Sequence, residues 1–92
     1  MRELLPGERV DHFRIVRKMG SDATTIRYEA QHEGIAQPVV MLRVLNEGGD
    51  QKQFELEAFL HAKRGASPRM FDMGRTADGT MYTVHEFIPE LH

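Results

Sequence analysis

The amino-acid sequence predicts an α+β domain in which a five-stranded antiparallel sheet carries one helix on one face. Three observations lead to this fold class. Several short segments have alternating or dense hydrophobicity, turn residues separate them, and one longer segment has helical periodicity with capping residues at both ends. Along the chain, three strands precede the helix and two follow it, so every link is short except the helical crossover.

The first three predicted strands come before the helix. Segments 12–19 and 24–31 intersperse apolar residues with charged ones, and Gly20-Ser21-Asp22 between them is a turn signal, so we expect a hairpin. Segment 38–45 is almost continuously apolar, which is typical of a central strand covered on both faces. We expect Pro38 at its first position, where a missing N–H costs least.

The helix is predicted from Gln51 to Arg64, with Asp50 as N-cap and Gly65 just beyond the C-terminus. One helical stripe contains Phe54, Glu57, Ala58 and His61.

A second hairpin closes the predicted fold. The short strand Met70–Met73 and the return strand Met81–Ile88 flank an Asp78-Gly79 turn, and Pro89 ends the return strand.

Composition excludes several classes of partner. The chain has 92 residues, enough for one small domain, and a formal net charge of −2 with a pI of about 6.2. We therefore expect neither nucleic acid nor a membrane surface as partner, and a cytoplasmic location. The sequence holds no cysteine and no apolar run close to the ~20 residues of a membrane helix.

Taken together in this order, the segments resemble the N-terminal, nucleotide-side lobe of bacterial Hanks-type Ser/Thr protein kinases over nearly the whole chain. The segments are Leu5–Val10 with Phe13–Ile15 (the family's opening), Met19-Gly20 (the start of its Gly-rich loop), Tyr28-x-Ala30 (the following strand), Val40–Leu45 (its Val-Ala-Ile-Lys strand), Phe54-x-x-Glu57 (its αC helix), and Phe71–Gly74 with Tyr82–Ile88 (its next hairpin and hinge). The resemblance implies a strand order of 1-2-3-5-4 along the sheet, with an αC-like helix beside it. It also implies that residues 1–92 form one such lobe within a larger protein.

The resemblance places a vestigial nucleotide site at Gly20, Asp22, Thr25, Arg27, Met41, Arg43, Glu57, His85, Glu86 and Phe87. Only the first glycine of the Gly-rich loop is present, because Asp22 and Thr25 stand at the second and third. Asp22 brings a negative charge to the place where a triphosphate would lie. Arg27 and Met41 are larger than the family's Val and Ala and, with His85 at the gatekeeper position, would fill or polarise the adenine cleft.

Arg43 stands where the family has its phosphate-pairing Lys. It keeps the charge, and the resemblance implies a pair between Arg43 and Glu57 of the helix. One interpretation is that Arg43 only satisfies Glu57 and holds the helix, since Arg suits a carboxylate in a bidentate manner. The other is that Arg43 retains a role toward phosphate.

We expect no catalytic residue and no metal site in this chain. The sequence contains neither a His-Arg-Asp catalytic loop nor an Asp-Phe-Gly motif, and Asp72 in Phe71-Asp72-Met73-Gly74 is interpreted as a surface residue. The histidines show no metal-binding spacing. We expect no cofactor, and at most weak binding of ATP·Mg²⁺.

Three functional hypotheses follow. The first is a degenerate kinase-like lobe that serves as a regulatory or protein-interaction module. The second is an ATP-binding fragment of an active Ser/Thr kinase, and the third is a non-catalytic nucleotide sensor. The expected partners are a kinase large lobe, another protein domain, or a second copy bound through the surface of the helix and sheet.

Overall fold

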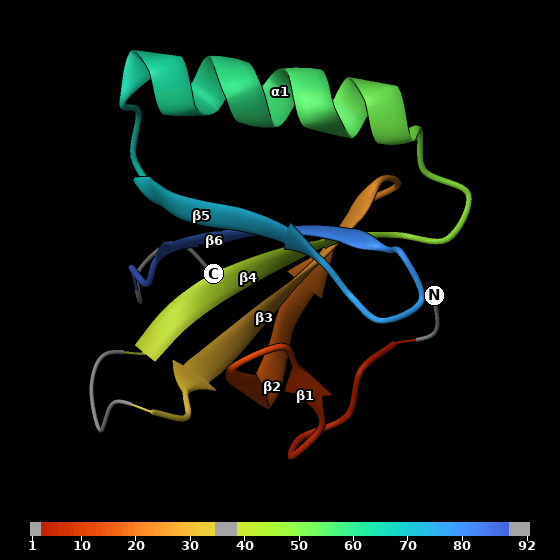
Figure 1. Cartoon of the computed structure of the whole chain (residues 1–92), viewed down its shortest axis with the longest axis vertical. Coiled ribbons are helices and arrows are strands. Elements are labelled where there is room, and N and C mark those ends of the chain that lie inside the picture. Colours follow the sequence, from red (N-terminus) through yellow and green to blue (C-terminus); the bar gives the residue numbers. More distant parts are fainter. Residues whose placement is uncertain (1–2, 35–38, 89–92) are drawn as a thin grey trace.

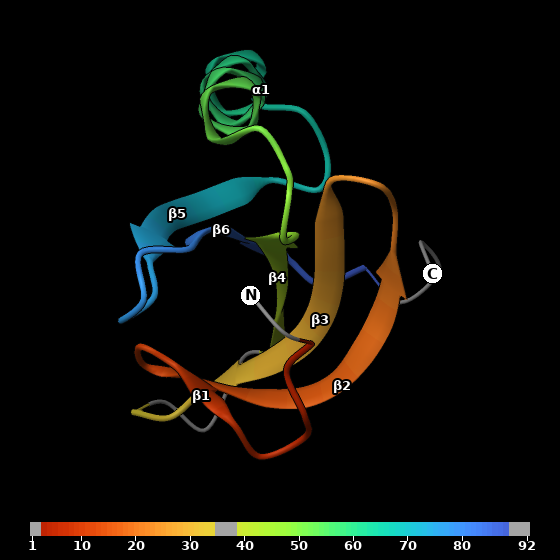
Figure 2. The same cartoon turned by 90° about the vertical axis from the view of Figure 1, so that its right-hand side faces the viewer.

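The computed structural model describes residues 3–34 and 39–88 and shows a strongly curled antiparallel sheet with one helix outside it (Figures 1 and 2). The strands are β1 (Arg9–Val10), β2 (Phe13–Ser21), β3 (Thr25–His32), β4 (Val39–Leu45), β5 (Met70–Arg75) and β6 (Met81–Glu86), and α1 spans Gln51–Arg64. The predicted fold class is confirmed. Pro38 and Pro89, expected at the ends of strands, lie outside the described residues.

The predicted number of strands was wrong, because the described sheet has six strands in the order β1-β2-β3-β4-β6-β5. The additional strand, β1, has two residues, and Val10 pairs with Phe13 across a tight turn. Two residues are too few to show alternation in a sequence. After β1, the other five strands follow the order 1-2-3-5-4 that the resemblance implied.

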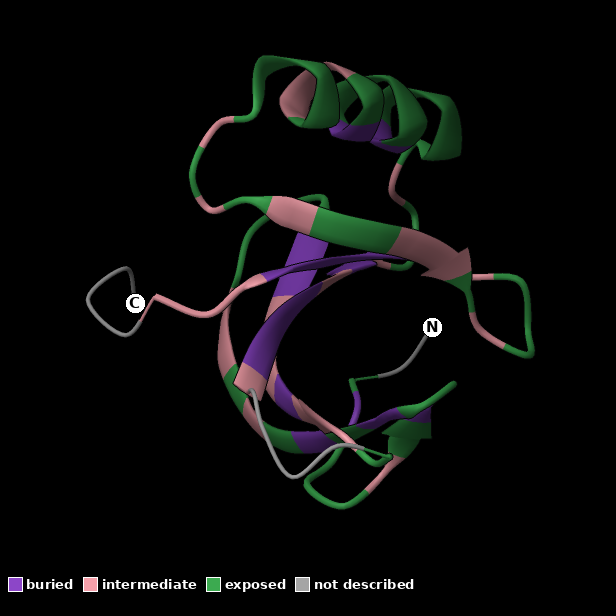
Figure 3. Ribbon diagram, turned by 60° about the vertical axis from the view of Figure 1, so that its left-hand side comes forward, coloured by how far each residue is buried: buried purple, intermediate pink, exposed green. Residues whose placement is uncertain are grey.

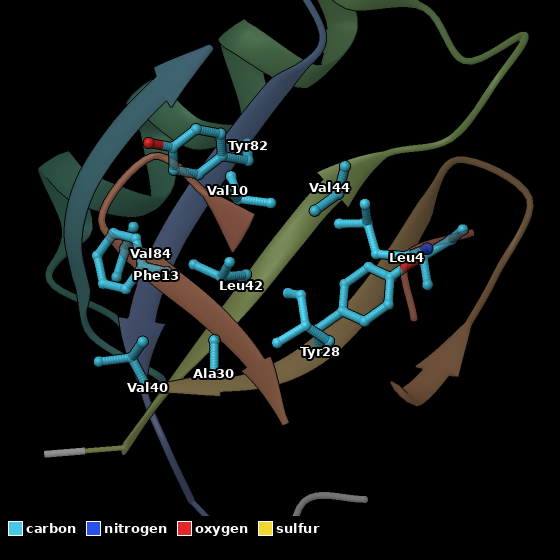
Figure 4. Packing of buried hydrophobic residues seen from close by; sticks show 12 residues of the cluster. Leu4, Val10, Phe13, Tyr28, Ala30, Val40, Leu42, Val44, Tyr82 and Val84 are labelled. Atoms are coloured by element: carbon cyan, nitrogen blue, oxygen red, sulfur yellow. Dashed lines mark hydrogen bonds between the residues drawn. The ribbon is translucent and has the colours of Figure 1, made fainter. Parts of the chain in front are cut away.

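Alternation along β4 separates two faces of the sheet. Val40, Leu42 and Val44 point into the concave interior, where they join the main core. Figure 4 shows this core between the strands, with Tyr28, Phe13 and side chains of β6 around it. The remaining members are Leu4, Val10, Ile15, Ile26, Ala30, Tyr82 and Val84.

The outer face of the sheet carries α1. Leu45 of β4 and Met81 of β6 form a second, smaller core with Phe54 of the helix, and Met73 packs against it. Phe54 and Ala58 are the buried residues of α1, and most of the rest of the helix is exposed (Figure 3). The helix is therefore attached through a narrow stripe.

Both predicted caps of α1 are confirmed. The Asp50 carboxylate accepts a hydrogen bond from the Gln53 amide at 3.2 Å. Gly65 has a φ of 64° and donates its N–H to the carbonyls of His61 and Ala62. A glycine is favoured here because this left-handed conformation strains residues with a Cβ. Within residues 3–34 and 39–88, no helix is long and apolar enough to cross a bilayer.

Candidate functional site

Four predicted site residues lie on the outer face of the sheet, where three adjacent strands bring them together. Arg27 of β3 is directly opposite Arg43 of β4, and Met41 of β4 is directly opposite His85 of β6. With Asp22 they line a cavity of about 310 Å³, to which His61 and Pro68 also contribute. The structure thus brings five of the predicted site residues together around one small cleft.

The turn between β2 and β3 is closed by the carboxylate of Asp22. Oδ1 accepts hydrogen bonds from the backbone amides of Thr24 at 2.9 Å and Thr25 at 2.8 Å. The Asp22 amide in turn donates to the Thr25 carbonyl at 2.9 Å. These amide bonds lower the pKa of Asp22 to about 2, because they stabilise the ionised carboxylate. Two N–H groups of the loop are therefore already bound to an anion of the same chain.

Arg27 occupies the space beneath Gly20. A Cβ at Gly20 would lie 2.6 Å from a guanidinium nitrogen at the end of the Arg27 side chain, so a larger residue at position 20 would displace that guanidinium. Another guanidinium nitrogen of Arg27 lies 3.8 Å from the Asp22 carboxylate. The two charged residues compensate each other at the mouth of the cleft.

The expected Arg43–Glu57 ion pair is absent between these two described residues. Glu57 is exposed on α1 and accepts a hydrogen bond from the Gln53 side chain at 3.2 Å. The helix presents Phe54 and Ala58 to the sheet instead, and this rotation carries Glu57 away from β4. Arg43 stays half-buried in the cleft.

His85 is the most deeply buried polar residue of the cleft, at 1% exposure. Burial is the main reason that the pKa of His85 falls to about 4, so the ring is neutral at pH 7. Its Nδ1 lies 3.1 Å from the Pro68 carbonyl, and its Nε2 lies 2.9 Å from the Thr83 hydroxyl. A neutral ring satisfies both contacts, since Nδ1–H donates to the carbonyl and Nε2 accepts from the hydroxyl.

His61 of α1 completes this network. Its Nε2 lies 2.6 Å from the same Pro68 carbonyl, and its ring meets the His85 ring edge-on at 5.2 Å between centroids. Sequence reasoning placed His61 on the correct helical stripe but did not predict its contact with His85. That contact depends on how the helix rotates against the sheet, which no local pattern records.

The other predicted residues lie around the cleft and do not line it. Glu86 accepts a hydrogen bond from the Arg69 amide at 2.8 Å and so holds the segment between α1 and β5. Thr25 is buried, with its hydroxyl 3.3 Å from the Asp22 carboxylate. Phe87 is half-buried just after β6. Among the described residues, no group of three or more His, Asp or Glu side chains is placed to hold a metal ion.

The fold closely matches part of a known kinase domain. No family model matches the chain, and no curated protein does. The crystal structure of the Mycobacterium tuberculosis PknI kinase domain matches with a TM-score of 0.70 and 20% identity, over 95% of this chain and 38% of that one. An engineered double mutant of the same domain gives a TM-score of 0.71 and 22% identity, over 94% and 37%. The chain thus spans little more than a third of the kinase domain that it matches, and it has the fold of a protein-kinase N-terminal lobe.

Proposed function

We propose that this chain is a kinase-like N-lobe that works as a regulatory and protein-interaction module and transfers no phosphate on its own. The observation that carries the proposal is the Asp22 carboxylate bound to the amides of Thr24 and Thr25. A working Gly-rich loop offers such amides to the phosphates of ATP. Here an internal anion already holds them.

Competition for these amides disfavours a triphosphate. To reach them, a phosphate would have to displace a carboxylate that is part of the same turn, and it would meet a like charge if the carboxylate stayed. At an effective dielectric near 20, two like charges ~5 Å apart repel by about 3 kcal/mol. Arg27 adds a steric obstacle, because its guanidinium lies against Gly20.

The proposed interaction surface is the groove between α1 and β5. Leu56 and Phe59 of the helix are 52% and 61% exposed. Beside them lies a cavity of about 530 Å³ lined by Glu55, Phe59, Ala62, Met70, Met73, Gly74, Arg75 and Met81. Methionines and exposed aromatic rings of this kind are typical of adaptable protein-binding surfaces.

We propose a second copy of this chain as the occupant of the groove. Glu55 and Arg75 form an exposed ion pair at 3.4 Å on its rim, so the surface carries both signs of charge. A two-fold dimer places the same patch on both partners, and an acid beside a base can then pair across the axis as well as within each chain.

A titration with ATP·Mg²⁺, followed by backbone amide shifts, tests the loss of nucleotide binding. We expect no saturable shifts in the wild type at millimolar nucleotide, but saturable shifts in the double variant Asp22→Gly/Arg27→Val, which frees the loop amides and the space below them. Asp78→Gly is the matched control, because it removes a turn carboxylate from the other hairpin. Saturable shifts at Gly20, Met41, Arg43 and Glu86 of the wild type would overturn this part of the proposal.

Sedimentation at increasing concentration tests the interaction surface. We expect reversible dimerisation that Phe59→Ser weakens. Leu5→Ser is the control, because Leu5 is 58% exposed and is not among the residues lining the groove. A monomer at all concentrations, or equal effects of both substitutions, would contradict self-association through this groove.

Nucleotide sensing is the second candidate function, and one observation favours it. Arg27 and Arg43 are directly opposite on one face of the sheet, and Asp22 is the only carboxylate that lines the described cleft. The lining therefore carries two guanidinium groups against one carboxylate, with His85 neutral at pH 7. The same titration separates the two candidates, because a sensor would bind ATP in the wild type.

A further inference from the structure

A third cavity lies on the concave side of the sheet, on the face opposite the cleft. It has a volume of about 500 Å³, within the range of small-molecule sites. The curled sheet stays open between its two edge strands, β1 and β5, which do not pair (Figures 2 and 3), and residues on both sides of this seam line the cavity. Its lining residues are Asp11, His12, Phe13, His32, Val40, Phe71, Asp72, Met73, Gly74, Tyr82 and Val84. We call it the seam pocket.

The floor and one wall of the seam pocket are apolar and aromatic. Val40 and Val84 are buried members of the main core. The Phe13 ring meets the His32 ring edge-on at 5.2 Å between centroids, and the His12 ring stacks on His32 at 5.9 Å. These neighbouring rings, which pack against one another, form a wall that suits a flat or branched apolar group.

The opposite wall is formed by Tyr82, whose ring lies directly against Gly74. A Cβ at Gly74 would be 2.6 Å from the Tyr82 hydroxyl oxygen and 2.8 Å from the ring carbon that bears it. The Tyr82 side chain thereby extends past β5, and its hydroxyl donates a hydrogen bond to the Asp11 carboxylate across the seam.

The pocket carries two carboxylates, those of Asp11 and Asp72, beside the polar groups of Tyr82, His12 and His32. Asp11 accepts a hydrogen bond from the Tyr82 hydroxyl, and Asp72 accepts one from the amide of Met73 at 2.8 Å. Burial is the main reason that the pKa of the Tyr82 phenol is raised, and the charges of Asp11 and Asp72 raise it further. Both carboxylates therefore act on the same phenol. Within residues 3–34 and 39–88, no Lys or Arg lines the pocket or forms an ion pair with either carboxylate. The pocket therefore offers two carboxylates that no Lys or Arg of the described residues neutralises.

We propose that the seam pocket binds a small organic cation, namely a protonated amine with an aromatic or branched apolar body. The ammonium group would lie between Asp11 and Asp72, and the apolar body would lie among Phe13, His32 and Phe71. Phe71 of β5 lines the pocket and is 55% exposed, so its ring is free to contact such a ligand. The site is independent of the nucleotide cleft, because alternate residues of β4 and β6 face the two cavities.

Amide-shift titrations of the wild-type chain with three probes test this proposal. The probes are phenethylammonium, its neutral analogue 2-phenylethanol and the anion 3-phenylpropionate. We expect saturable shifts at His32, Phe71 and Gly74 with phenethylammonium, and binding about tenfold weaker for the alcohol, since a charge-assisted hydrogen bond is lost. No binding is expected for the anion.

Two variants locate the site. Asp11→Asn/Asp72→Asn should weaken phenethylammonium binding about tenfold and make it insensitive to salt. Asparagine fits position 11, where φ is 52°, better than most residues do. The control is Glu57→Gln, which removes one charge from exposed α1. Equal affinity for the ammonium and the alcohol, no shifts with any probe, or an unchanged affinity in the double variant would each overturn the proposal.

Discussion

The side chain of His85 links three parts of the molecule through its two ring nitrogens and the edge-on contact of its ring with His61. It contacts Thr83 on its own strand, the Pro68 carbonyl before β5, and the ring of His61 on α1. Because burial lowers its pKa from 6.5 to about 4, the folded protein binds fewer protons here than the unfolded chain at intermediate pH. The contribution of neutral His85 to the free energy of unfolding is complete above pH 6.5 and is lost as the pH falls toward 4.

We therefore predict an acid-sensitive stability that depends on this residue. Between pH 6.5 and 4 the wild type should lose roughly 3 kcal/mol of unfolding free energy through His85, since each pKa unit is worth about 1.4 kcal/mol. Urea unfolding across this range measures the slope. His85→Gln should flatten it, whereas the control His12→Gln, at an exposed site, should not. The same slope in His85→Gln and the wild type would show that the histidine does not titrate with unfolding.

Gly74 is a second residue whose role follows from its contacts. Gly74 has no Cβ, and the Tyr82 ring fills the space that a Cβ would occupy. A Cβ there would lie 2.6 Å from the Tyr82 hydroxyl oxygen, closer than real Cβ atoms approach other atoms. Gly74→Ala should destabilise the fold by about 1–3 kcal/mol, as overpacking does. Gly34→Ala is the control, because a Cβ there would meet only the end of the His32 side chain, at 3.4 Å. Chemical denaturation of the two variants side by side checks this, and equal stabilities would count against the contact.

At the scale of elements, α1 depends strongly on its caps. The buried stripe consists of Phe54 and Ala58, so the helix gains little from packing, and short helices are marginal in water. Asp50→Ala should cost about 1 kcal/mol through the loss of the bond to the Gln53 amide. Asp50→Ser should restore most of this, because serine also caps well. Urea unfolding gives the size of the effect, and amide exchange along α1 shows whether the helix frays first.

The elements also show what sequence alone predicts. The caps of α1, the alternation in β3 and the dense apolar run of β4 are local patterns, so the helix and these strands could be located from them. The two-residue β1 leaves no such pattern. The direction of Glu57 was mispredicted because a helical stripe spans several residues, and only packing on the sheet decides which of them turn inward. The turn at Asp22 was recognised, but its capture of two backbone amides becomes evident only with the atoms in place.

At the scale of the whole molecule, the sheet curls back on itself without closing. A hydrogen bond between residues distant in sequence spans the curl, since Tyr82 of β6, the strand next to the edge, donates to Asp11 in the turn after β1. The other tyrosine, Tyr28, accepts a hydrogen bond from the Leu4 amide at 2.8 Å and so fixes the segment before β1. Both phenols are buried within the curled sheet, which makes them reporters of its integrity.

Alkaline pH should therefore unfold the protein through its two tyrosines. Burial raises the pKa of both phenols above the ordinary value of 10.0, so above pH 10 the folded state binds more protons than the unfolded state. Stability is then unaffected below pH 10 and falls as the pH rises beyond it. The ultraviolet absorbance of tyrosinate should stay low in the folded protein until circular dichroism shows unfolding, while in denaturant both tyrosines titrate near pH 10. Tyr82→Phe should shift the unfolding to higher pH, because it removes one of the two phenols whose ionisation favours the unfolded state. Tyrosinate absorbance that rises near pH 10 while the circular dichroism stays native would mean that the curled sheet leaves its phenols open to water.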